Sequence, residues 1–192
     1  MIAGPGAFAR VALIAVVAVI LQLSGLGPHR IFGVQPDFVP LAVAAVAIYA
    51  GSVAGAAMGF GTGLLLDLVV GGTMGVSSLV LSAVGYAVGR YREVRDPAHG
   101  LMPIPVGALA TLGWGVAFAA VSFMLDVGAS VSPLVLRDML LTIALNAVIA
   151  LPAFALCRRV LRPALLVDPL DRRRRRQAPR ETGPLGLRGL EI

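Results

Sequence analysis

The chain has 192 residues, of which 58% are hydrophobic and 14% are charged, and its net charge is +6. Soluble domains carry about 25% charged residues, so this composition excludes an ordinary soluble domain. The long apolar runs do not alternate with polar residues, as the strands of a membrane β-barrel would. We therefore expect an all-α integral membrane protein.

The first predicted span covers residues 8–26. Within it, Arg10 precedes an apolar run that begins at Val11. A secretory signal would end in a small-x-small cleavage site. The residues at this point, LQLSGLG, fit that pattern poorly. We therefore expect an uncleaved first helix, followed by a polar connection in which Pro28 and Pro36 break the helix.

The next apolar stretch, residues 38–66, contains no charged side chain. A single helix of this length would reach roughly 43 Å, whereas the hydrocarbon core is about 30 Å thick. Gly51 and Ser52 offer a place to turn. We therefore predict two short, closely packed helices joined near residues 49–52, with a single tilted helix as the alternative.

Turn signals and charged stretches divide the rest of the chain. Three glycines in VGGTMG predict a tight turn, and RYREVRDPAHG and DVGASVSP predict polar connections. We expect a membrane bundle of about six helices over residues 1–157 and a basic, disordered cytoplasmic tail over residues 158–192. The last three spans are predicted at residues 76–89, 102–125 and 134–157.

Arginine placement predicts the orientation of these spans. All 16 basic residues are arginine. With six spans, the arginines of residues 90–95, the tail and Arg10 share one side, and only Arg30 and Arg137 lie on the other. Cytoplasmic segments carry the excess of basic residues. We therefore expect both termini in the cytoplasm, whereas a five-span model would move only the N-terminus outside.

The stretch GSVAGAAMGFGTGLLLD places a glycine at every fourth position. Residues four apart share a helix face, and small residues let helix backbones approach closely in lipid. The ordinary interpretation is packing within the bundle, and the sharper one is docking of a partner helix. The glycines of the row are Gly51, Gly55, Gly59 and Gly63. Span four has a similar edge of small residues, namely Gly75, Ser78, Ser82, Gly85 and Gly89. Span five has another, namely Gly107, Thr111, Gly115 and Ala119.

Two aspartates stand at the predicted outer ends of spans. Asp37 precedes the second span, where its side chain could cap the helix. Asp67 follows the glycine row at a helix C-terminus, where the helix dipole disfavours a carboxylate. An acid near membrane depth is a candidate functional group. The partners predicted for Asp67 are Arg30, Arg137 or backbone N–H groups of the glycine turn, and the alternative is contact with a partner or ligand.

Other polar residues carry no catalytic pattern. His29 and His99 fall on opposite sides of the six-span model, and the sequence has no HExxH, CxxC or phosphate-binding loop. We therefore expect no enzyme, cofactor or metal site. Asn146 is expected to make a hydrogen bond between helices, and Cys157 to be a packing residue rather than a lipidation site.

The arginine-rich end of the chain predicts contact with anionic lipids. No aromatic residues interleave with these arginines, so nucleic acid is not an expected partner. An acidic cytoplasmic protein is the alternative partner. The predicted lipid contacts are Arg158, Arg159, Arg162, Arg172, Arg173, Arg174, Arg175 and Arg176.

The block of residues 36–89 resembles the rod shape-determining protein MreD family. It shows a Pro-Asp before the second span, a GxxxGFxxGLxxD core and a GY in the following span. The residues that carry the resemblance are Pro36, Asp37, Gly55, Gly59, Phe60, Gly63, Leu64, Asp67, Gly75, Gly85 and Tyr86. The long arginine-rich terminus departs from the family's usual short one.

The resemblance implies a non-enzymatic scaffold of the bacterial cell-elongation complex in the inner membrane. It implies binding to MreC, and through MreC to MreB and to the enzymes of peptidoglycan synthesis. The family's fold is similar to the substrate-binding subunits of energy-coupling-factor transporters, so a vitamin-type transport subunit is the alternative. The predicted partner-binding residues are Asp37, Gly55, Gly59, Gly63, Asp67, Gly71 and Gly72.

Overall fold

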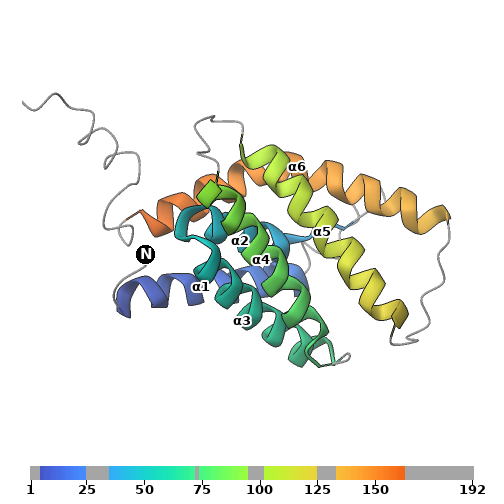
Figure 1. The fold of residues 1–192 in the computed structure, drawn as a ribbon, viewed down its shortest axis with the longest axis horizontal. Coiled ribbons are helices and arrows are strands. Elements are labelled where there is room, and N and C mark those ends of the chain that lie inside the picture. The colour runs from blue at the N-terminus through green and yellow to red at the C-terminus, as the bar shows by residue number, and fades with distance from the viewer. Residues whose placement is uncertain (1–4, 25–34, 72–73, 95–101, 125–132, 163–192) are drawn as a thin grey trace, which may run out of the picture.

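The computed structural model describes residues 5–24, 35–71, 74–94, 102–124 and 133–162, and these residues form six helices (Figure 1). Four helices contain stretches long and apolar enough to cross a membrane, and α2 is apolar but shorter. The expectation of an all-helical membrane bundle is confirmed. The helices are α1 Pro5–Leu23, α2 Phe38–Ala50, α3 Ser52–Val70, α4 Val76–Val94, α5 Pro103–Met124 and α6 Pro133–Leu161.

The uncharged stretch after Asp37 folds as two helices, α2 and α3, and the alternative of one tilted helix is wrong. Gly51 separates them with a φ of 97°, a backbone conformation that side chains disfavour. The N–H of Gly51 still donates to the carbonyl of Ala47, which closes α2. The chain therefore turns at a glycine, where no side chain opposes this backbone conformation.

Helix α2 forms the centre of the bundle. It contacts all five other helices, and its residues from Val39 to Ile48 are all buried. With 13 residues, it is about 20 Å long and cannot cross a 30 Å hydrocarbon core. Its burial inside the bundle explains why it needs no polar face.

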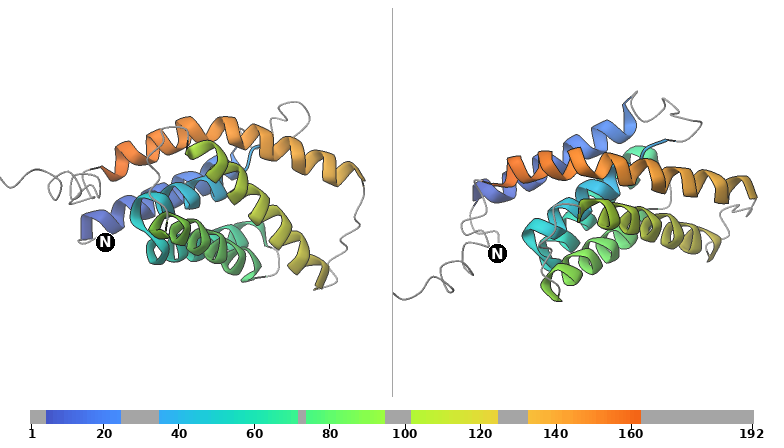
Figure 2. Two further views of the ribbon diagram at one scale, coloured as in Figure 1. Left: turned by 45° about the horizontal axis from the view of Figure 1, so that its top comes forward. Right: turned by 90° about the horizontal axis from the view of Figure 1, so that it is seen from above.

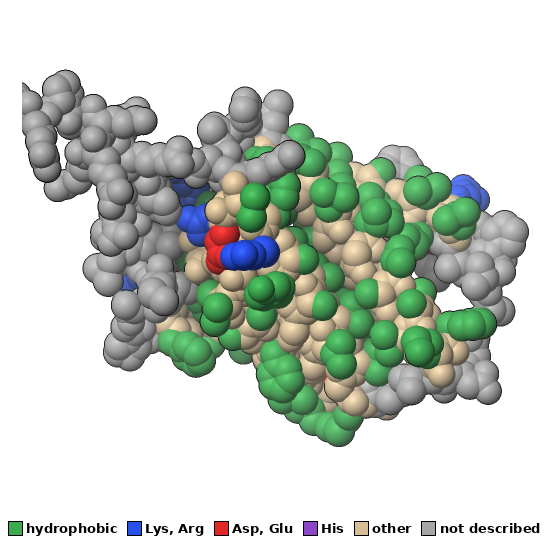
Figure 3. Space-filling model, in the orientation of Figure 1, with side chains coloured by type: hydrophobic (Ala, Val, Ile, Leu, Met, Phe, Trp, Pro, Cys, Tyr) green, Lys and Arg blue, Asp and Glu red, His purple; other side chains and the backbone are tan. Residues whose placement is uncertain are grey.

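The outside of the bundle is also apolar. Large hydrophobic side chains of α1, α3, α5 and α6 are exposed, among them Phe8, Phe60, Leu109 and Val148, and apolar side chains spread across the face shown in Figure 3. In water such a surface would be a large exposed apolar patch. In a bilayer it is the surface that lipid chains contact.

One end of the bundle is basic. Helix α4 extends five residues beyond its predicted end, to Val94, and α6 extends to Leu161, so their last turns contain Arg92 and Arg158. Both arginines are near enough to Tyr49 to act on it electrostatically. Figures 1 and 2 show the start of α1 beside the end of α6. We call this end of the molecule the basic end.

Candidate functional site

The glycine row joins α3 to α4, which run antiparallel. Gly59 lies against the backbone of Leu81, Gly63 against that of Ser78, and Gly55 against the carbonyl of Gly85. At each of the three glycines a Cβ atom would lie within 3 Å of these backbone atoms. The expectation that the row packs the bundle is therefore confirmed: the partner of this face is the chain's own α4.

At the basic end of this hairpin, Glu93 of α4 holds the start of α3. Its Oε1 accepts hydrogen bonds from the backbone N–H of Ser52 at 3.0 Å and from the Ser52 hydroxyl at 2.7 Å. Its Oε2 accepts from Arg90 at 3.1 Å. The bonds from Ser52, followed by that from Arg90, lower the pKa of the Glu93 carboxyl to about 2. Glu93 is thus a cap supplied from another helix, and no local pattern in the sequence predicts it.

At the opposite end, Asp67 of α3 holds the start of α4. Its Oδ2 accepts a hydrogen bond of 2.8 Å from the N–H of Gly75, which directly precedes α4 and has a φ of 98°. Asp67 is 5% exposed. Of the partners predicted for it, a backbone N–H of the glycine turn is the one confirmed. Arg30 lies outside the described residues.

The two acids therefore clamp the hairpin reciprocally. Each lies near the C-terminal end of one helix and accepts hydrogen bonds at the N-terminal end of the other. Free N–H groups and the positive end of the helix dipole favour a carboxylate at such a position. The unfavourable location of Asp67 at the end of α3 is offset by its favourable location at the start of α4.

A second polar site lies where α2 begins inside the bundle. Asn146 of α6, which is fully buried, accepts from the Asp37 N–H and donates to the Asp37 carbonyl, both at 3.1 Å. It also donates to the Thr111 hydroxyl of α5 at 2.9 Å. The amide of Gln22 on α1 donates to the Asp37 carboxylate at 3.1 Å. These four residues, which we call the Asn146 network, link α1, α2, α5 and α6.

The network confirms that Asn146 bonds between helices, but it corrects the role predicted for Asp37. The Asp37 side chain makes no capping hydrogen bond to α2. The Gln22 carbonyl oxygen accepts from the N–H of Phe38 at 2.7 Å and serves as the cap. The physical reason is that the Gln22 amide engages both the Asp37 carboxylate and the helix start. No spacing in the sequence signals a cap donated from α1.

Gly71, another residue predicted to bind a partner, lies at the tip of the α3–α4 hairpin. Gly71 ends α3 with a φ of 71° and is exposed, and Gly72 lies outside the described residues. Beside Gly71, four apolar side chains are each more than half exposed. These four residues, Leu68, Val69, Val70 and Met74, form the surface that we call the apolar tip.

The predicted lipid-contact arginines are only partly described. Arg158 and Arg159 occupy the last turn of α6 and are exposed, as is Arg162 after it. Residues 172–176 and the rest of the predicted tail lie outside the described residues. Cys157 is buried, as expected of a packing residue. Within the described ranges, no cluster of three His, Cys, Asp or Glu side chains could hold a metal ion.

Comparison with known proteins identifies the family of the chain from its sequence. A family model described as rod shape-determining protein MreD matches residues 6–160. The match extends from the first turn of α1 to the last turn of α6. No curated protein and no solved structure matches the chain, so the expected similarity to energy-coupling-factor subunits has no support.

Proposed function

Since the chain belongs to the MreD family of rod shape-determining proteins, we propose that it is a membrane scaffold of the cell-elongation complex that binds MreC. Through MreC, the chain would associate with MreB and with the enzymes of peptidoglycan synthesis. The family is a non-enzymatic one of multi-pass membrane proteins that determine cell shape. The family match over all six helices is the observation that carries this proposal.

The apolar tip is the surface that we assign to the partner. The glycines of the row are buried against α4, and Asp67 is engaged by Gly75, so these predicted site residues hold the tip in place. Val69, Val70 and Met74 are each more than 60% exposed there. Such a surface would accept an apolar transmembrane or juxtamembrane segment of MreC.

The basic end supports the proposed orientation. Arg90 and Arg92 end α4, and Arg158 and Arg159 end α6. An excess of arginine marks the cytoplasmic side. The start of α1 lies beside the end of α6 (Figure 2), so both termini are assigned to the cytoplasm. The apolar tip is then at the outer face of the inner membrane.

The scaffold is favoured over a vitamin-type transport subunit by the character of the cavity between α4 and α5. Nine of its ten lining residues are apolar aliphatic residues, methionine, proline or glycine, and Tyr91 is the tenth. A small-molecule site needs a few convergent polar groups to orient its ligand. This cavity presents one hydroxyl group.

Co-purification with MreC tests the proposed surface. We expect the double variant Val69→Ser and Met74→Ser to recover several-fold less MreC than the unaltered chain, because the partner loses apolar contact at the tip. Val53→Ser, at the other end of the same helix and 79% exposed, is the matched control and should retain full recovery. Full recovery with the inserted tip variant would reject the tip as the binding surface. Reporter fusions at both termini test the orientation.

A further inference from the structure

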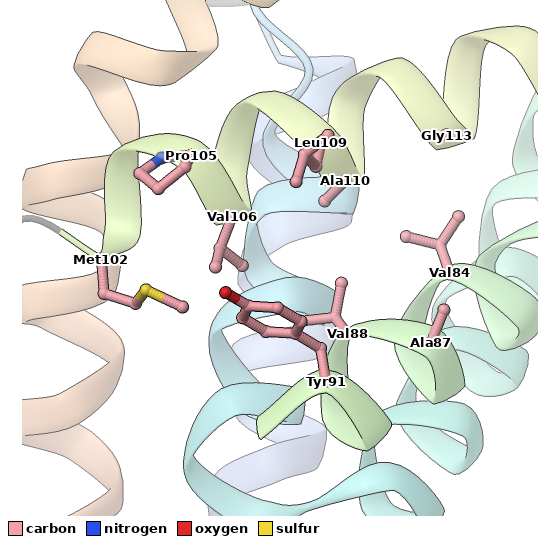
Figure 4. Close-up of a pocket in the computed structure, with 10 residues that line it drawn as sticks. All are labelled: Val84, Ala87, Val88, Tyr91, Met102, Pro105, Val106, Leu109, Ala110 and Gly113. Carbon is pink, nitrogen blue, oxygen red and sulfur yellow. The ribbon is translucent and has the colours of Figure 1, made fainter. Parts of the chain in front are cut away.

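The cavity between α4 and α5 has the shape of a groove. Figure 4 shows side chains of both helices around it, with Met102 at one end, Gly113 at the other and the Tyr91 ring between Met102 and Val88. Its volume is about 240 Å³. We propose that this groove binds one acyl chain of an anionic phospholipid, with the lipid headgroup at the arginines that end α4.

Small side chains create the groove. Ala87 on α4 and Ala110 and Gly113 on α5 face it where larger apolar residues would bring the two helices into contact. At its far end the helices do approach each other, because a Cβ on Gly113 would lie 3.7 Å from the Val84 side chain. The groove is therefore narrow at its deep end and shaped for a slender apolar ligand.

The length of the groove matches one leaflet. Its α5 lining begins at Met102, next to the start of the helix, and ends at Gly113. Eleven residues of helix rise about 16 Å, which is close to half of a hydrocarbon core of about 30 Å. An extended acyl chain of a single leaflet spans that depth, whereas a partner's transmembrane helix would continue past Gly113.

Arginines in the last turns of α4, the helix end at which Tyr91 lines the groove, select the headgroup. Tyr91 lines the groove and is 40% exposed, and Arg90 and Arg92 are its neighbours in the last turns of α4. The Arg90 side chain is 62% exposed although its Nη1 donates to Glu93, and a guanidinium has further donors for a phosphate. Figure 3 shows basic and acidic side chains together beside the apolar surface. Anionic lipids are attracted to such juxtamembrane arginines.

Retention of lipid by the full-length chain tests the proposal. The chain is reconstituted in nanodiscs of phosphatidylglycerol and phosphatidylcholine, and the lipids that remain bound after release are measured by native mass spectrometry. We expect the unaltered chain to retain phosphatidylglycerol preferentially. Ala87→Phe fills the groove and should lower that retention several-fold. The matched control Ala83→Phe, exposed one turn away on α4 but outside the lining, should leave it unchanged.

The headgroup is tested separately. Arg90→Gln should lower the preference for phosphatidylglycerol, and Arg90→Lys should restore it. Lipid held by the arginine-rich tail is common to all variants, so it does not affect the comparison. If Ala87→Phe does not insert, Gly113→Leu fills the groove from α5. Equal phosphatidylglycerol retention by a filled variant and the unaltered chain would overturn the proposal. So would equal retention of phosphatidylcholine, or a protein adduct at a photoreactive residue replacing Leu109. These results are independent of MreC recovery, and only the assignment to the cytoplasmic leaflet rests on the proposed orientation.

Discussion

The bundle is held together in two different ways, in the α3–α4 hairpin and in the Asn146 network. The hairpin brings two backbones together through regularly spaced glycines, and an acid closes it at each end. The network joins four helices through polar side chains, and in it the Asn146 side chain bonds the backbone of Asp37, 109 positions earlier in the chain. The hairpin therefore depends on missing side chains, whereas the network depends on polar groups that satisfy one another.

This difference implies different responses to substitution. Adding atoms breaks the hairpin, because backbone at the contact cannot move aside as a flexible side chain can. Removing atoms damages the network, because the remaining donors and acceptors stay buried without partners. Four comparisons test how the two regions are held, in order of decreasing expected effect on the free energy of unfolding.

The largest effect is expected for Gly59→Leu. Its Cβ would overlap the Leu81 carbonyl, so the hairpin must open, at a cost of about 3 kcal/mol or more. Gly61→Leu is the matched control on the same helix, since a Cβ there would meet nothing within 4 Å. Thermal unfolding in detergent compares the two. Equal stability of both variants would show that the contact is not close-packed.

Next is Asn146→Ala, which leaves the Asp37 N–H and carbonyl and the Thr111 hydroxyl without this partner. We expect a loss of about 2 kcal/mol. A double-mutant cycle with Thr111→Val should show a coupling free energy of about 0.5 kcal/mol or more between the two sites. Additive losses would mean that the two side chains do not act together.

A smaller effect is expected for Asp67→Ala, which removes the acceptor for the Gly75 N–H. Loss of a helix cap costs about 1 kcal/mol. Asp67→Asn keeps an acceptor oxygen but no charge, so its unfolding temperature should lie between those of Asp67→Ala and the unaltered chain. If the asparagine variant is as unstable as the alanine variant, the charge rather than the hydrogen bond stabilises α4.

The smallest effect is expected for Glu93, which is at the exposed end of the hairpin. Its pKa falls from 4.5 to about 2 in the folded chain. Its stabilising contribution is therefore complete above pH 4.5 and is lost as the pH falls through about 2. The difference in unfolding temperature between the unaltered chain and Glu93→Gln should shrink over that window. A difference that stays constant with pH would contradict the proposed cap.

The hairpin was largely predictable, because a glycine at every fourth position specifies a close helix contact by itself. The turn at Gly51 and the buried bond of Asn146 were predicted for similarly local reasons. The caps made by Glu93 and Gln22 were not, since each acts on a helix that it does not belong to. The predicted cap by Asp37 was wrong because local position cannot show that the Gln22 amide competes for the helix start.

The apolar tip could be located only in part. The Gly71-Gly72 turn in the sequence indicated a site at this end of α3. The glycine row could not show which helix packs against the glycine face of α3. That depended on the register between α3 and α4, in which Gly55 lies against Gly85 and Gly59 against Leu81. The groove between α4 and α5 left no signal in the spacing, because it depends on small residues of two helices facing each other.

The reciprocal clamp also bears on how the chain enters the membrane. Helix α4 is not among the four helices that are long and apolar enough to cross on their own, and it carries Arg90, Arg92 and Glu93 near its end. Beside α3, the Gly75 N–H at the start of α4 donates to Asp67, and Glu93 of α4 accepts from Ser52. The two helices thus satisfy each other's polar ends only as a pair, which favours their joint transfer into lipid during biogenesis, with α3 leading as the earlier segment to be synthesised.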